Sequence, residues 1–110
     1  MKINLSLTPE NAIIIAATIQ AVYNSKGFTR REKSTLSIAL DVASKLDLKA
    51  VHLKETANLF DAKKRIKVSL KFHEADMLEL LLIQQMKDVH EPYIRMEIQK
   101  TINDLNQKLA

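Results

Sequence analysis

Two stretches of the chain alternate between apolar and polar residues, which is the pattern of a half-buried β-strand. In the first stretch, Ile3, Leu5 and Leu7 are separated by polar residues. In the second stretch, after Arg65, the alternating apolar residues are Ile66, Val68, Leu70 and Phe72. The pattern predicts two strands, each with one face on a core and the other face in solvent.

Each predicted strand is followed by two stretches with helical periodicity. After the first strand, a helix that is apolar almost all round is expected from Pro9 to about Asn24. A second helix is expected to begin at Thr29, which can form a capping box with Glu32, and to end near Leu46. Its apolar stripe predicts that one face packs on a core.

The second half of the chain repeats this order. A broad apolar helix is expected to end near Asp88, and a last amphipathic helix to begin at Glu91-Pro92. The stripe of the last helix consists of Ile94, Ile98, Ile102, Leu105 and Leu109. Between the halves, residues 47–64 fit either a short helix or a strand, and we favour the helix.

The matching order of elements indicates an internal duplication with an offset of 63 residues, because residues 3–7 align with residues 66–70. We therefore expect a helix-dominated α+β fold with a duplicated β-α-α unit. The two copies are expected to be related by pseudo-twofold symmetry, and the fold to contain a two-stranded sheet. The expected organisation is a single domain, residues 1–110, with a first repeat (1–48), a connector (49–64) and a second repeat (65–110).

Composition narrows the chemistry of this 110-residue chain. It contains no cysteine, which excludes disulfides and thiolate chemistry, and its single glycine excludes a glycine-rich phosphate loop. The histidines His52, His73 and His90 lack the spacing that lets one helix face bind a metal. The run His73-Glu74-Ala75-Asp76 resembles a set of ligands or an acid–base pair, but acidic and polar residues favour the first turn of a helix, and we prefer that interpretation. We expect no enzyme activity, cofactor, metal or small-molecule substrate.

The formal net charge is +4, and the excess is concentrated in one segment without acidic residues. Its basic residues are Lys63, Lys64, Arg65, Lys67 and Lys71. Such a segment forms either a solvated face or a polyanion-binding surface. The chain shows no signal-peptide pattern, and its longest apolar run is too short to cross a bilayer, so we expect a cytoplasmic protein without membrane contact.

The apolar first and third helices favour a protein-binding function. Two short strands and two outer helices can hardly cover so much apolar surface, so we expect either a homo-oligomer or a protein partner. Met77, Met86 and Met96 could add an adaptable contact surface, or they could belong to the core. The leading hypothesis is a small regulator or inhibitor that acts through protein–protein interaction.

The second hypothesis is DNA binding, and it comes from a resemblance. Two units of one strand and two helices, with Gly27-Phe28-Thr29-Arg30 before the second helix, resemble the ribbon-helix-helix DNA-binding family. In that family two strands pair antiparallel, and the ribbon enters the major groove. The resemblance implies base contacts from Lys2, Asn4, Ser6, Lys67, Ser69 and Lys71, and a phosphate contact near Thr29 and Arg30.

The position of the ribbon lysines distinguishes the two hypotheses. If Lys2, Lys67 and Lys71 line one exposed two-stranded ribbon, DNA binding is favoured. If a helix covers that face, or if the strands are not neighbours, DNA binding is disfavoured. The second repeat departs from the family, because Asp88 to Pro92 contains no glycine turn.

Overall fold

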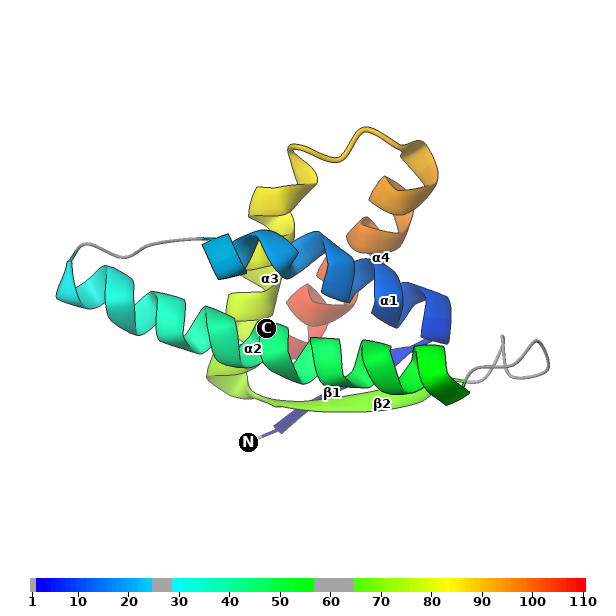
Figure 1. Ribbon diagram of the computed structural model, residues 1–110, viewed down its shortest axis with the longest axis horizontal. Helices are drawn as coiled ribbons and strands as arrows, with labels where there is room; N and C mark the ends of the chain where they lie inside the picture. Colours follow the sequence, from blue (N-terminus) through cyan, green and yellow to red (C-terminus); the bar gives the residue numbers. More distant parts are fainter. Residues whose placement is uncertain (1, 25–28, 57–64) are drawn as a thin grey trace.

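The computed structural model describes residues 2–24, 29–56 and 65–110, which form two strands, four α-helices and one 3-10 helix (Figure 1). In chain order these are β1 (Lys2–Leu7), α1 (Pro9–Thr18), η1 (Ile19–Asn24), α2 (Arg30–Thr56), β2 (Ile66–Lys71), α3 (Phe72–Met86) and α4 (Pro92–Leu109). The helix-dominated α+β class and the two-stranded sheet are as expected from the sequence.

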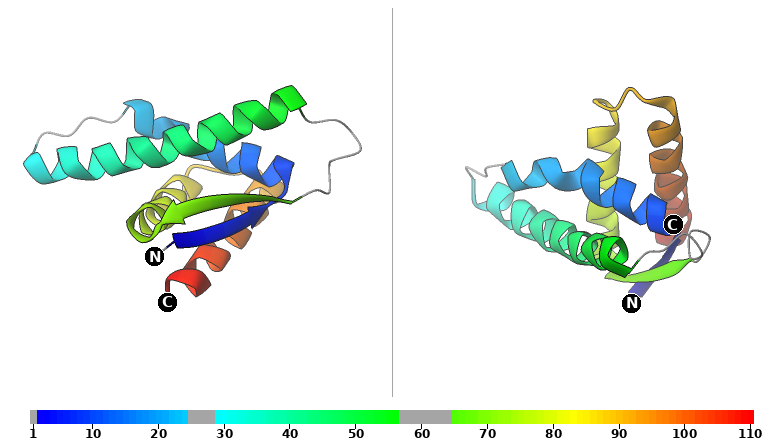
Figure 2. Two further views of the ribbon diagram at one scale, coloured as in Figure 1. Left: turned by 90° about the horizontal axis from the view of Figure 1, so that it is seen from below. Right: turned by 45° about the vertical axis from the view of Figure 1, so that its right-hand side comes forward.

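The two strands pair antiparallel and form a ribbon along one edge of the molecule (Figure 1). Alternate side chains point to opposite faces of the ribbon, as the period of two predicts. The buried face consists of Ile3, Leu5, Leu7, Val68 and Leu70, together with the partly buried Ile66. The other face is not crossed by any described helix when the ribbon is seen from below (Figure 2, left).

The first helix is shorter than the sequence predicts. The Thr8 hydroxyl accepts a hydrogen bond from the Asn11 N–H at 3.1 Å and caps α1. The α-helix ends at Thr18, whose hydroxyl donates to the Ile14 carbonyl at 2.8 Å, and the chain continues to Asn24 as η1. A 3-10 turn at the end of an α-helix is common, because its tighter hydrogen bonds use carbonyls that the helix leaves free.

The second helix is longer than the sequence predicts. The capping box is present, since the Glu32 N–H donates to the Thr29 hydroxyl and the Thr29 N–H donates to Glu32 Oε2. The predicted end near Leu46 is wrong, because α2 continues without a break to Thr56. No glycine or proline follows Leu46 within α2, and Ala50, one turn later, continues the buried stripe. Residues 57–64 lie outside the described part of the chain.

The third helix begins directly where β2 ends. Phe72 was expected on the apolar face of the strand, but it is the first residue of α3 and is 44% exposed. The Glu74 carboxylate accepts the Lys71 N–H at 2.9 Å, which satisfies a backbone donor at the start of the helix. This local cap explains why the strand pattern stops one residue early.

The last helix matches its prediction closely. Glu91 caps α4 by accepting the N–H groups of Tyr93 and Ile94. Ile98 and Leu105 are fully buried, and Ile102 is nearly so. The fully buried side chains of the core come from both strands and from every helix: Leu5, Ile15, Ile19, Val42, Leu46, Leu70, Leu78, Leu82, Ile98 and Leu105. A single copy of the chain therefore buries its own core.

Candidate nucleic-acid interface

The exposed face of the ribbon collects six polar side chains that the sequence analysis singled out. Lys2 lies opposite Lys71, Asn4 opposite Ser69, and Ser6 opposite Lys67. Ser6 is partly buried and the other five are exposed. Residues from the start and from the middle of the chain thus form one small surface with lysines at both ends and an Asn–Ser pair between them.

The charge of this face is not offset within the ribbon. Neither strand contains an aspartate or a glutamate. Lys2 and Lys71 are direct cross-strand neighbours, and like charges in that position destabilise a sheet. An anion bound over the ribbon would relieve this repulsion, whereas the strands themselves offer nothing that does so.

Two further cations lie at the outer edge of β1. Lys108, near the end of α4, donates to the Asn4 carbonyl at 2.6 Å and pairs with Asp104 at 3.1 Å. The Arg65 guanidinium donates to the hydroxyl and the carbonyl of Ser6, at 2.8 and 2.7 Å. Sequence reasoning did not place Lys108 here, because Lys108 and Asn4 are 104 residues apart and no local pattern connects them.

The outer edge of β2 is flanked by α2. The Lys45 ammonium group lies 2.7 Å from Glu74 Oε2 and 2.8 Å from Oε1, which also accepts the Lys71 N–H. Burial of Glu74 disfavours its charged form, but the hydrogen bonds from Lys45 and Lys71 outweigh this, so its pKa lies below its usual value. Glu74 therefore ties α2 to the end of the ribbon.

The structure does not bring Thr29 and Arg30 to the ribbon. Both residues lie at the N-terminal end of α2, which projects away from the strands (Figure 1). Arg30 and Lys45 are separated by about 22 Å along the helix, at the usual rise per residue. Residues 27 and 28 of the family-like turn lie outside the described residues.

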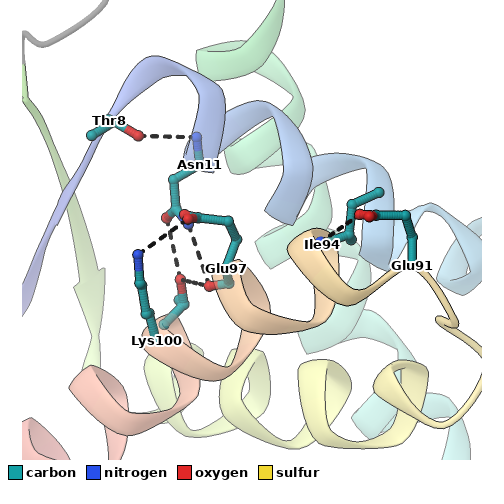
Figure 3. Close-up of polar contacts among 7 residues, drawn as sticks. Thr8, Asn11, Glu91, Ile94, Glu97 and Lys100 are labelled. Atoms are coloured by element: carbon teal, nitrogen blue, oxygen red, sulfur yellow. Dashed lines mark hydrogen bonds and ion pairs between the residues drawn. The ribbon is translucent and has the colours of Figure 1, made fainter.

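A second polar cluster joins α1 to α4 beneath the start of α1 (Figure 3). Asn11 donates to Glu97 Oε2 at 2.9 Å, and the Thr101 hydroxyl donates to Asn11 Oδ1 at 3.2 Å. Lys100 pairs with Glu97 at 3.2 Å. Asn11 and Thr101 are buried, so these groups are satisfied by one another.

Large apolar side chains remain exposed on α2, α3 and α4, and the most exposed is Leu48 of α2 at 69%. The first helix, expected to need outside cover, buries Ala12, Ile15 and Ala16 within the chain. Leu80 and Ile83 of α3, one turn apart, are each 45% exposed. Met77 and Met86 pack against the core, while Met96 is 47% exposed.

Comparison of the chain with protein-family models, curated proteins and solved structures finds no match in any of the three. Within the described residues, no helix combines the length and the apolar character that crossing a bilayer requires.

Proposed function

We propose that the chain binds double-stranded DNA by inserting the β1–β2 ribbon into the major groove. The observation that carries this proposal is the exposed ribbon face, with Lys2, Lys67 and Lys71 around the Asn4–Ser69 pair and no acidic residue on either strand. The major groove is wide enough for a two-stranded ribbon. This proposal reverses the order of the two hypotheses drawn from the sequence, because the ribbon is uncovered and the core is complete within one chain.

The side chains of the ribbon suit base edges as well as phosphates. Lysine can donate to guanine O6 and N7, asparagine can pair with adenine N6 and N7, and serine can contact either. Asn4 and Ser69 occupy neighbouring positions on the two strands, so together they can read adjacent bases. In this proposal the lysines on both sides attract the duplex and the central pair selects the site.

We also propose that the chain arose by duplication of a β-α-α unit. The strand pairing supports it, since Leu5 lies opposite Val68 and the two positions are related by the 63-residue offset. In this proposal, a twofold axis through this pair relates one strand to the other. The helices differ in length between the halves, with 27 residues in α2 and 18 in α4, so the two half-sites on DNA are expected to be unequal.

Fluorescence anisotropy with a labelled random duplex at ~50 and ~200 mM salt tests the proposal, because counterion release makes phosphate binding weaken steeply over this range. The test variant replaces Lys2, Lys67 and Lys71 with Gln. The control variant replaces Lys33, Lys87 and Lys100 with Gln, which changes the net charge equally but leaves the ribbon intact.

The wild type and the control variant are expected to bind at the lower salt with micromolar affinity and to lose most of it at the higher salt. The ribbon variant is expected to bind about tenfold more weakly or worse at the lower salt. Equal loss in the two variants would show that only net charge matters. Absence of wild-type binding at the lower salt would refute DNA binding altogether.

A second candidate function is protein binding through α3, as a regulator or inhibitor or as a homo-oligomer. It is favoured by the exposed Leu80 and Ile83, which form an apolar ridge outside the ribbon. Light scattering across a concentration series tests the homo-oligomer, with a Leu80→Lys, Ile83→Lys variant as the control. A concentration-dependent mass that the variant abolishes supports the α3 interface, and a monomer at every concentration contradicts self-association.

A further inference from the structure

Two lysines of α2, Lys45 and Lys49, lie beside β2 and do not belong to the ribbon. Lys45, Leu48 and Lys49 of α2, with Val68 and Ser69 of β2, line a shallow groove of about 360 Å³. Ser69 belongs to the exposed ribbon face, so this groove opens beside the proposed base-reading surface. In the view from below, α2 runs alongside β2 (Figure 2, left).

Lys45 and Lys49 are four residues apart and therefore lie on the same side of α2, one turn from each other. Glu74 holds the ammonium group of Lys45 beside the junction of β2 and α3. Lys49 is exposed, and within the described part of the chain it has no ion pair. One lysine is thus fixed in place by its carboxylate partner, and the other is available to an external anion.

Asp41, one turn before Lys45, is the nearest acidic residue on this side of α2 toward its N-terminus. Glu74 is already engaged by Lys45 and by the Lys71 N–H. Lys45 is thus offset by Glu74, and Lys49 lies one turn farther from Asp41 on the side of α2 next to the ribbon. A duplex whose groove receives the ribbon would bring one phosphate backbone past this side.

We propose that α2 contacts the phosphate backbone of duplex DNA through Lys49, supported by Lys45, and not through its N-terminus. This inference rests on the proposed DNA binding, and it departs from the contact near Thr29 and Arg30 that the family resemblance implies. The N-terminal end lies about 22 Å from Lys45 along the helix, so the two arrangements place the phosphate contact at distant points of α2.

The slope of log affinity against log salt distinguishes the two positions, because each phosphate contact contributes about −0.9 to it. Anisotropy with the same random duplex would compare the full-length wild type with Lys49→Gln and Arg30→Gln. Lys87→Gln is the matched control, because Lys87 follows the end of α3 farthest from the ribbon (Figure 1). Circular dichroism would verify that each variant is folded.

The proposal predicts that Lys49→Gln reduces the magnitude of the slope by about 1, while Arg30→Gln and Lys87→Gln leave it unchanged. A reduced slope in Arg30→Gln with an unchanged slope in Lys49→Gln would overturn the α2 contact and leave the ribbon proposal standing. Equal reductions in all three variants would also overturn it. A wild type that does not bind the duplex at all would refute the proposed function itself, and this inference with it.

Discussion

The polar side chains of the ribbon and those of the α1–α4 junction are arranged in opposite ways. At the junction, Asn11, Thr101 and Glu97 form hydrogen bonds with one another, and Lys100 neutralises the carboxylate (Figure 3). On the ribbon, Lys2 and Lys71 face each other across the strands without an acidic neighbour on either strand.

This difference separates polar groups that hold the fold from polar groups that are available to a ligand. A buried cluster that satisfies its own donors and acceptors contributes to stability, and breaking it leaves a buried group unpaired. An exposed row of like charges contributes nothing favourable to the folded chain, yet it attracts a polyanion. Mutations in the two regions should therefore affect different measurements.

The largest expected loss of stability comes from truncating a core side chain on the buried face of the ribbon. Leu70 is fully buried on the inner face of β2, opposite Ile3. Leu70→Ala should lower the free energy of unfolding by about 2–5 kcal/mol, because it removes buried methyl groups and leaves a cavity. Urea unfolding followed by circular dichroism measures the loss. A change below about 0.5 kcal/mol would mean that the ribbon does not cover a packed core.

A smaller effect is expected when the junction is broken. Asn11→Ala removes the donor to Glu97 and the acceptor of the Thr101 hydroxyl. The unpaired groups should lower the free energy of unfolding by about 1–3 kcal/mol. Affinity for the random duplex should stay unchanged, since the junction is not part of the ribbon face. If Asn11→Ala keeps its stability but loses DNA affinity, the junction serves DNA binding and not stability, which contradicts the comparison.

Glu74 links stability to pH at the end of the ribbon. Its folded-state pKa lies below its ordinary value of 4.5, so its contribution is present above about pH 4.5 and is lost as the pH falls through the folded-state pKa. Glu74→Gln should cost about 1 kcal/mol near neutral pH. The difference from the wild type should shrink in acid, and urea unfolding at a series of pH values measures it. A difference that stays constant down to about pH 3 would exclude titration of Glu74 as its source.

The smallest effect is expected for a lysine that is paired and exposed. Lys100→Gln removes the ion pair with Glu97, and the lysine side chain is 63% exposed. Such pairs contribute about 0.2–1 kcal/mol, so thermal unfolding should shift only slightly. Lys67→Gln, on the ribbon, should leave stability equally unchanged but weaken DNA binding. If both variants bind DNA like the wild type, the distinction between the two lysines fails.

The sequence predicted those parts of the fold that have local signals. Alternation located both strands, and the caps at Thr8, Thr29 and Glu91 located three helix starts. Helix ends were harder, because α2 lacks a breaker after Leu46 and α1 changes to a 3-10 helix without one. These ends depend on packing: Gln20 and Tyr23 of η1 both donate hydrogen bonds to Asp47 of α2.

The candidate site was only partly predictable for the same reason. Alternation alone put Lys2, Asn4 and Ser6 on one face, and Lys67, Ser69 and Lys71 on another. The antiparallel register that joins the two faces is a tertiary property. The neighbours at the edges of the ribbon, Lys45 and Lys108, come from helices whose sequence pattern gives their buried stripe but not the strand beside them.

The most direct test of the account is a ¹H–¹⁵N correlation experiment on the labelled protein, titrated with a duplex. It reports which surface the DNA contacts, independently of any mutation. If the ribbon enters the major groove, the amide signals of residues 2–6 and 66–71 shift progressively, while those around Leu80 and Ile83 stay in place. Shifts confined to α3 or to the α1–α4 junction, with the ribbon signals unmoved, would contradict it.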